Sequence, residues 1–78
     1  MRTRRIKIRG YAVCLRNAEF AASLEMRKLY PVVEDPEAEA HNLIRVVDES
    51  GEDYLYPAGL FQKLSLPSDV QRALRLAS

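Results

Sequence analysis

The stretch that decides the fold is Ile44-Arg-Val-Val-Asp-Glu-Ser-Gly-Glu-Asp-Tyr-Leu-Tyr-Pro-Ala-Gly-Leu-Phe61. Its apolar residues recur at every second position on both sides of a polar segment that contains Gly51. A two-residue period is typical of a strand with one buried face, and glycine readily adopts the positive φ of a hairpin turn. Pro57 has no N–H for a ladder and ends the second strand. The stretch therefore predicts a β-hairpin, followed by a tight turn that returns Phe61 to the interior.

Three more strands are predicted around this hairpin. Alternating apolar residues place the first within residues 6–16 and the last over residues 62–66. Residues 29–33 are apolar and β-prone. Pro31 lies within them, so this strand must be at an edge of the sheet or must leave Pro31 where no donor is needed.

Two connecting segments allow alternatives. Residues 17–26 could form a helical turn capped by Asn17 or a long folded-over loop, and we favour the loop. The acidic residues 34–42 are either a solvated loop or one short helical turn after Pro36. Both segments are predicted to lie at the surface.

The chain is predicted to end in a helix over residues 68–77. Ser68 is a favourable N-cap, and Gln71 follows three residues later, as in a capping box. The apolar residues then follow helical spacing at Val70, Ala73, Leu74 and Ala77. A helix of about ten residues is marginal alone, so its apolar stripe must rest on the sheet, on its own end or on a partner.

Length and composition predict one small globular domain over residues 1–78, with residues 1–5 flexible. A chain of 78 residues that is 47% hydrophobic and 29% charged has an ordinary globular composition. Cys14 is the single cysteine and excludes an intramolecular disulfide. The charged start lacks the apolar core of a signal peptide, and no stretch is long enough to span a bilayer. We therefore expect a cytoplasmic protein without membrane contact.

This order of elements resembles a Src-homology-3-like small barrel. Residues 24–33 look like the strand after that family's first long loop, residues 44–56 like its central hairpin, and residues 56–61 like the turn before its final strand. Residues 12–66 are also similar to small bacterial proteins of unassigned function, which share Ala-Ser-Leu, Tyr-x-Val and Asp-Glu-Ser-Gly-Glu-Asp-Tyr-Leu-Tyr-Pro. The resemblance implies a mainly β fold: a small five-stranded Src-homology-3-like barrel with a short C-terminal α-helix.

The resemblance also implies a peptide groove, whose residues can be compared one by one. The peptide-binding members grip a polyproline helix with aromatic side chains, including a tryptophan at the start of the hairpin. This chain has no tryptophan, and Asn42 or Leu43 occupies that place. Leu60 stands near the family's final groove tyrosine, and only Pro57 matches its counterpart. Binding of proline-rich peptides is therefore not predicted.

We predict a non-enzymatic protein-interaction module without a cofactor. The alternation directs three tyrosines inward, namely Tyr30, Tyr54 and Tyr56. If one of them points outward instead, it would form an exposed apolar patch with Leu55, Pro57 and Leu60, and such a patch usually marks a contact site. These three residues are the predicted protein-binding site, for an unidentified partner or a second copy.

Charge segregation provides the alternative function. Basic residues without an intervening acid gather at the start of the chain, at Arg2, Arg4, Arg5, Lys7 and Arg9. Residues 34–53 hold eight acids against Arg45 alone, and the net charge is +1. A basic segment on a small barrel is compatible with nucleic-acid binding. Contact between the basic end and the acidic region of a second copy would explain the segregation equally well.

Catalytic and metal-binding roles have weaker support. Cys14 and His41 are the candidate nucleophile and base, but nothing local places them together, and a cysteine in a strand is more often a buried hydrophobe. The alternating residues Asp35, Glu37, Glu39 and His41 lack zinc or calcium-loop spacing. The hairpin acids Asp48, Glu49, Glu52 and Asp53 are expected to face solvent or to pair with Arg45 or Lys63.

Overall fold

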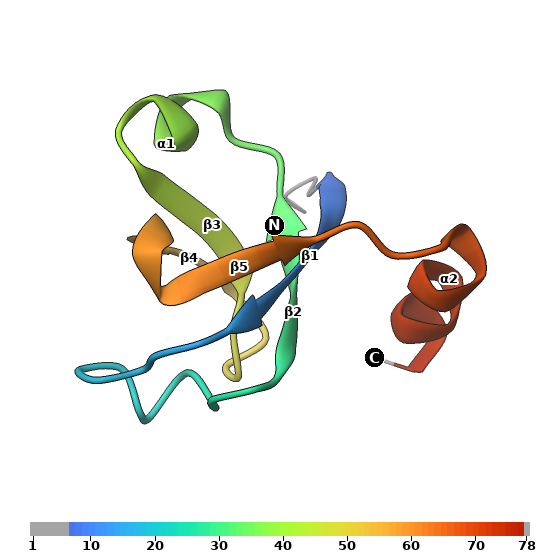
Figure 1. The fold of residues 1–78 in the computed structure, drawn as a ribbon, viewed down its shortest axis with the longest axis horizontal. Helices are drawn as coiled ribbons and strands as arrows, with labels where there is room; N and C mark the ends of the chain where they lie inside the picture. The colour runs from blue at the N-terminus through green and yellow to red at the C-terminus, as the bar shows by residue number, and fades with distance from the viewer. Residues whose placement is uncertain (1–6, 78) are drawn as a thin grey trace, which may run out of the picture.

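Five strands form one antiparallel sheet in the computed structural model, which describes residues 7–77 of the chain (Figure 1). The strands are β1 (Ile8–Cys14), β2 (Leu29–Val33), β3 (Leu43–Val47), β4 (Asp53–Pro57) and β5 (Phe61–Leu64). Helix α1 (Pro36–Ala40) lies between β2 and β3, a 3-10 turn (Ala58–Leu60) precedes β5, and helix α2 (Ser68–Ala77) follows it. The predicted mainly β fold with a short C-terminal helix is confirmed.

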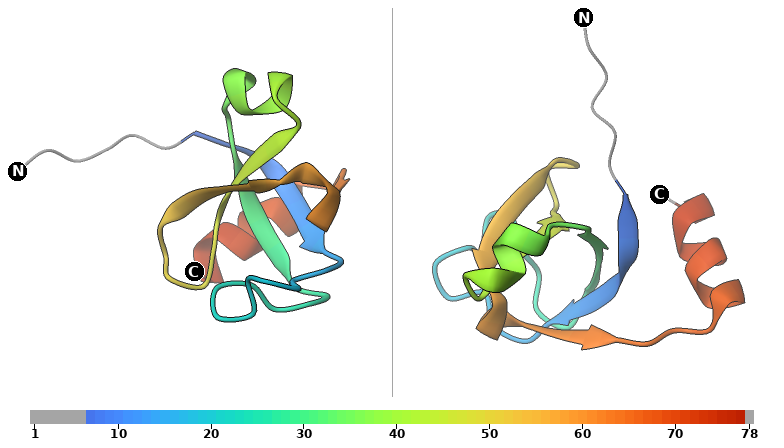
Figure 2. Two further views of the ribbon diagram at one scale, coloured as in Figure 1. Left: turned by 90° about the vertical axis from the view of Figure 1, so that its left-hand side faces the viewer. Right: turned by 90° about the horizontal axis from the view of Figure 1, so that it is seen from above.

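The strands are ordered β4-β3-β2-β1-β5, so the last strand pairs with the first. Tyr11 is opposite Leu64, and Cys14 is opposite Phe61. Figure 2 shows the strands curving around a common centre. The sheet is nevertheless not closed, because β4 and β5 are its two edges.

The core lies inside this curved sheet. Its buried residues come from every strand and from the loop between β1 and β2, and they are Ala12, Cys14, Leu24, Tyr30, Val32, Ile44, Val46, Tyr56 and Phe61. Aromatic rings meet edge to face, with centroids 6.3 Å apart for Tyr30 and Phe61. In β2 and β3 the inward residues are two positions apart, as the sequence period predicted, whereas β4 and β5 each contribute one residue to the core.

The segment between β1 and β2, residues 15–28, is a loop built of turns, as expected, and is called the β1–β2 loop below. Its ends are held together by the Arg27 N–H, which donates to the Cys14 carbonyl at 2.7 Å. Arg27 adopts a left-handed φ of 67° at this point. Within the loop, Leu24 is completely buried and anchors the segment to the core.

The predicted hairpin is formed by β3 and β4. Ile44 is opposite Tyr56 and Val46 is opposite Tyr54, and Gly51 has a φ of 85° in the turn. Of the two alternatives for residues 34–42, the short helix after Pro36 is the one observed. Its N-cap is Asp35, whose side chain accepts a hydrogen bond from the Ala38 N–H at 3.1 Å.

Pro31 lies in an interior strand of the sheet, since β2 is flanked by β1 and β3. Pro31 is opposite Tyr11 of β1, at a position that alternates with the hydrogen-bonded pair Cys14–Lys28 and so needs no N–H there. The pairing between β2 and β3 is confined to Val32 and Val46 and does not reach Pro31. Of the two places predicted for this proline, the position that needs no donor is therefore the observed one. The missing N–H does not interrupt the sheet.

Helix α2 lies over the outer face of β1 and β2 (Figure 2). Its Leu74 and the outward residues Tyr11 and Pro31 line a hollow of about 280 Å³. Leu74 of the apolar stripe thus faces the sheet, one of the three alternatives, whereas Val70 is 39% exposed and Ala73 is exposed. The capping box is not the contact that forms, because the Gln71 side-chain amide donates to the Leu66 carbonyl at 2.9 Å.

Candidate functional site

Strand β4 carries two adjacent exposed apolar side chains on an edge of the sheet. Tyr54 is 58% exposed and Leu55 is 42% exposed, whereas Tyr56 is buried. The inward prediction for Tyr54 was therefore wrong. Tyr54 shares a face with Tyr56, but β4 is an edge strand, and only Tyr56 is covered by Phe20, with ring centroids 5.0 Å apart.

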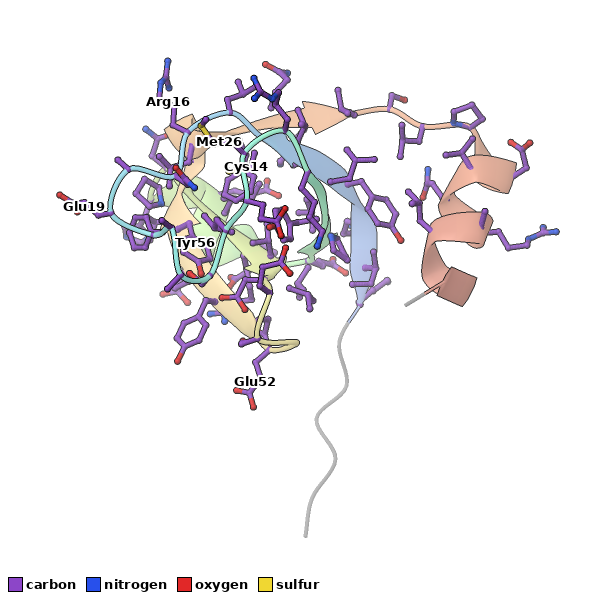
Figure 3. The ribbon with its side chains drawn as sticks, turned by 90° about the horizontal axis from the view of Figure 1, so that it is seen from below. Cys14, Arg16, Glu19, Met26, Glu52 and Tyr56 are labelled. Atoms are coloured by element: carbon purple, nitrogen blue, oxygen red, sulfur yellow. The ribbon has the colours of Figure 1, made fainter. Side chains whose placement is uncertain are left out.

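A cleft runs between β4 and the β1–β2 loop, and we call it the β4 cleft. The volume of the cleft is about 290 Å³, and Phe20 and Ser23 of the loop form one wall. Its remaining lining residues are Asp48, Ser50, Tyr54, Leu55 and Tyr56. In Figure 3, Tyr56 lies behind the β1–β2 loop, while Glu19 and Glu52 project outward from the loop and from the hairpin turn.

The floor of the β4 cleft is held by a hydrogen-bonded carboxylate. The Tyr56 hydroxyl donates to Asp48 Oδ2 at 2.5 Å and lies 2.9 Å from Ser23 Oγ. Asp48 Oδ1 accepts from the Ser50 N–H at 2.9 Å and from the Ser50 hydroxyl at 2.5 Å. Asp48 is only 5% exposed, so the expectation that this hairpin acid faces solvent or pairs with a base was wrong.

Electrostatics assign the charge in this network to Asp48 and the proton to Tyr56. Burial acts to raise the pKa of Asp48, but the hydrogen bonds from Ser50 and Tyr56 outweigh it and hold that pKa below its ordinary value. Burial, together with the neighbouring Asp48, raises the pKa of Tyr56. A neutral hydroxyl and an ionised carboxylate form a stable charge-assisted bond, so the network fastens the loop to the hairpin.

The carboxylate of Glu49 also fastens the β1–β2 loop to the hairpin. The Tyr30 hydroxyl donates to Glu49 Oε2 at 2.6 Å and accepts from the Glu25 N–H at 2.7 Å. Lys28 Nζ is 2.6 Å from the same Glu49 oxygen, and the Glu49 N–H donates to the Ser23 carbonyl at 3.0 Å. Hydrogen bonds from Lys28 and Tyr30 lower the pKa of Glu49.

The opposite face of β4 carries a second hollow, of about 280 Å³, which we call the acidic groove. Leu55 lines both hollows, and Leu43, Asp35, Glu37, Ala38, His41 and Arg45 complete this one. Arg45 Nε is 2.8 Å from Asp35 Oδ2, and Arg45 Nη1 is 3.0 Å from Asp53 Oδ2. The hydrogen bond from Arg45 lowers the pKa of Asp35.

The structure brings together two of the three predicted protein-binding residues. Leu55 and Pro57 are two positions apart on β4 and therefore lie on the same face of the strand, and Leu55 lines the acidic groove. Leu60 lies in the 3-10 turn, is partly buried and packs against the core. Its carbonyl accepts from the Leu15 N–H at 2.8 Å, which directs the turn toward β1.

The predicted nucleic-acid-binding residues are only partly described. Arg2, Arg4 and Arg5 lie outside the described residues. Lys7 Nζ is 3.6 Å and Arg9 Nη1 is 3.2 Å from carboxylate oxygens of Glu34. The two described cations are therefore paired with an acid of the same chain.

The remaining titratable candidates have structural partners. Cys14 is completely buried, burial raises its pKa, and its thiol lies 3.1 Å from the Arg16 carbonyl. His41 is exposed, with Nδ1 2.9 Å from the Glu37 carbonyl. Lys63 pairs with Glu39 at 3.5 Å instead of with the hairpin.

Within residues 7–77, no group of three or more metal-ligating side chains converges. None of the helices described there has the length and apolar content needed to cross a membrane.

Sequence reasoning missed Phe20, Asp48 and the Asp35–Arg45 pair. Asp48 followed by Ser50 and Gly51 carries a local signal, since aspartate commonly accepts from a backbone N–H two residues on. The contact between Asp48 and Tyr56 also joins the turn of the predicted hairpin to its second strand. Phe20 has no such signal, because its position depends on how the β1–β2 loop folds back.

Comparisons with protein-family models, with curated proteins and with solved structures find no match for this chain.

Proposed function

We propose that this protein is a non-enzymatic protein-interaction module that binds its partner along β4. One observation carries the proposal: Leu55, 42% exposed, lines hollows on both faces of an edge strand. Single exposed apolar residues are common on protein surfaces and need no explanation. An adjacent pair, Tyr54 and Leu55, beside two hollows is a feature of contact sites.

We also infer that the fold is an open Src-homology-3-like small barrel, related to small bacterial proteins of unassigned function. Support comes from the strand order, in which β5 joins β1, and from the long β1–β2 loop and the 3-10 turn before β5. The chain lacks the groove tryptophan of the peptide-binding members. The proposed ligand is therefore an extended segment that is not proline-rich.

The non-enzymatic part of the proposal is supported by the protonation states near the β4 cleft. Asp48 holds its negative charge and Tyr56 its proton, so neither is poised to exchange a proton near neutral pH. The buried Cys14 has a raised pKa, which disfavours the reactive thiolate. A cytoplasmic location, in which this cysteine would stay reduced, belongs to the same proposal.

Capture from a native lysate tests the proposal, with full-length tagged protein and a nuclease-treated duplicate. Leu55→Glu places a charge on β4, and Leu64→Glu is the matched control, because Leu64 is 38% exposed on the other edge strand, β5. We expect a protein that binds the wild type and Leu64→Glu, survives nuclease and is lost with Leu55→Glu. Equal capture by all three would contradict the proposal, and loss on nuclease treatment would favour nucleic acid.

A further inference from the structure

Two exposed apolar side chains lie next to each other at the base of the β1–β2 loop. Leu15 is 49% exposed and Met26 is 48% exposed. Leu15 follows Cys14 and Met26 precedes Arg27, so the two residues flank the hydrogen bond from the Arg27 N–H to the Cys14 carbonyl. This bond holds them together, and adjacent exposed apolar side chains are typical of a contact site.

Arg27 occupies a backbone position that favours glycine. The Arg27 N–H donates to the Cys14 carbonyl at 2.7 Å, and the Cys14 N–H donates to the Lys28 carbonyl at 3.0 Å, so two residues oppose one. This is a β-bulge, and the left-handed φ of 67° at Arg27 is the conformation that glycine adopts in one common type of bulge. A residue with a side chain is strained there, and such residues are most frequent at functional sites.

Nothing within the described part of the chain explains an arginine at this strained position. None of the ion pairs between described residues includes Arg27 or Arg16, and both side chains are exposed. Arg16 Nη1 donates to the Gly59 carbonyl at 2.9 Å, which holds this guanidinium in place and leaves its other N–H donors for a ligand. Arg16 and Met26 lie at the same end of the molecule (Figure 3). We call Leu15, Arg16, Met26 and Arg27 the loop-base patch.

The acids of the β1–β2 loop do not cancel the charge of the two arginines. Glu19 projects from another part of the loop (Figure 3). Glu25 is exposed and lies near Lys28, whose pKa is raised by its hydrogen bond to Glu49 and also by Glu25. Even when Glu25 is counted against the two arginines, one positive charge remains in surplus. The patch is therefore complementary to a negatively charged partner.

We propose that the loop-base patch binds a segment of a partner protein that carries carboxylates beside an apolar side chain. The two guanidinium groups pair with the carboxylates, which match their planar N–H geometry, and Leu15 and Met26 contact the apolar side chain. This inference goes beyond the proposed function. In Figure 3, Arg16 and Met26 lie away from Glu52 of the hairpin, so the patch is a second contact surface, separate from β4.

Other occupants fit the loop-base patch less well. Single-stranded nucleic acid is bound by aromatic stacking as well as by cations, and none of the four patch residues is aromatic. An anionic membrane surface would repel the neighbouring Glu25. A second copy would have to offer a different, acidic surface, and such a contact is not self-complementary and continues into a filament unless a ring closes. Methionine and arginine are both enriched in interfaces between proteins, which favours a protein partner.

The test uses the full-length ¹⁵N-labelled chain and a short capped peptide of alternating glutamate and leucine. We expect the largest shifts at the amides of residues 15, 16, 26 and 27, together with a shift of the Met26 methyl signal. Added salt should weaken binding, because it screens exposed ion pairs. A peptide with glutamine in place of glutamate should bind more weakly and show little dependence on salt.

Removal of a single charge tests the role of Arg27. Arg27→Gln keeps a long polar side chain and should weaken peptide binding about two- to fivefold, the range expected for an exposed ion pair. Arg72→Gln is the matched control, because Arg72 is an exposed cation on α2, which lies away from the β1–β2 loop (Figure 1). The control and Leu55→Glu should both bind the peptide as the wild type does.

The strained conformation provides a second readout that does not depend on binding. Arg27→Gly should weaken the peptide as much as Arg27→Gln does, while its urea midpoint should equal or exceed that of the wild type. Glycine relieves the left-handed strain, and this gain offsets the greater conformational freedom that glycine gives the unfolded chain. A midpoint below that of the wild type would show that the Arg27 side chain supports the fold, and would overturn the inference.

Four further results would overturn the inference. These are shifts that spare the four patch amides, equal binding of the glutamine peptide, equal weakening by Arg72→Gln, and displacement of the peptide by a single-stranded oligonucleotide or by phosphatidylserine vesicles. Concentration-dependent association that Arg27→Gln abolishes would assign the patch to a second copy and overturn the choice of partner. Each can occur while Leu55→Glu still abolishes capture of a protein on β4, so failure here is distinguishable from failure of the proposed function.

Discussion

Replacing Tyr56 by phenylalanine would remove one hydroxyl and leave the ring and its contact with Phe20 in place. That hydroxyl donates to Asp48 Oδ2 at 2.5 Å, and Asp48 is only 5% exposed. The variant leaves a buried carboxylate oxygen without this donor. Hydrogen bonds to charged groups contribute about 1.5–3 kcal/mol, and we expect the free energy of unfolding to fall by roughly this amount.

Such a loss is a large part of the total stability. At about 0.05–0.15 kcal/mol per residue, the chain of 78 residues has a free energy of unfolding of roughly 4–12 kcal/mol. Each kcal/mol lowers Tm by about 4–8 °C in a domain of this size, so Tyr56→Phe should lower Tm by roughly 6–24 °C. Urea unfolding followed by circular dichroism should show a lower midpoint with an unchanged slope.

Tyr54→Phe is the matched control, since Tyr54 is on the same strand and 58% exposed. Its stability should stay within about 0.5 kcal/mol of the wild type. A second control is pH. Because the folded-state pKa of Asp48 is lowered, its stabilising effect is present above the unfolded pKa and is lost as pH falls through the folded pKa.

The difference between Tyr56→Phe and the wild type should therefore shrink in acid. If Tyr56→Phe is as stable as Tyr54→Phe at neutral pH, or if the difference is the same in acid, the account of this network is refuted.

The other predictions concern acid stability, thiol access, the core and the acidic groove. The pKa of Glu49 is lowered in the folded protein, so stability falls as pH drops below about 4, and Glu49→Gln should flatten this dependence; equal slopes would contradict it. Cys14 should react with an aromatic disulfide reagent only as fast as the protein unfolds, and rapid reaction of the native protein would show that the thiol is accessible. Leu24→Ala should lower the free energy of unfolding by about 2–5 kcal/mol and lower the urea midpoint accordingly, so a cooperative transition with an unchanged midpoint would show that Leu24 does not anchor the loop. Arg45→Leu removes the cation between Asp35 and Asp53, and its urea midpoint should rise with added salt more steeply than that of the wild type; parallel salt dependences would argue against repulsion.

The strands could be predicted because their signals are local. The two-residue period of β3 and β4, the turn at Gly51 and the proline that begins α1 are all read from neighbouring residues. Each of these elements depends on backbone preferences that act over a few residues. The arrangement of the strands into a sheet was expected from a family resemblance, not from the residues themselves.

The candidate site was harder to predict because its geometry depends on contacts between distant residues. Alternation assigns Tyr54 and Tyr56 to one face, but Tyr56 is buried by Phe20 of the folded loop and by Phe61, whereas Tyr54 stays exposed. The sequence around Asp48 is typical of a solvated turn residue, but Asp48 is buried and its carboxylate accepts hydrogen bonds from the hydroxyls of Tyr56 and Ser50. Leu60 differs from Leu55 because the 3-10 turn directs it to the core.

The two carboxylate contacts that hold the β1–β2 loop have a consequence for the thermodynamics of recognition. Asp48 is linked to Ser23 through the Tyr56 hydroxyl, and Glu49 forms an ion pair with Lys28. The part of the β1–β2 loop between Ser23 and Lys28 is therefore held in place before any ligand binds. Fixing a residue's backbone costs about 1–2 kcal/mol of conformational entropy. Folding has already met this cost for the loop, so ordering of the loop does not reduce the binding free energy of a ligand, and association can proceed without a slow ordering step.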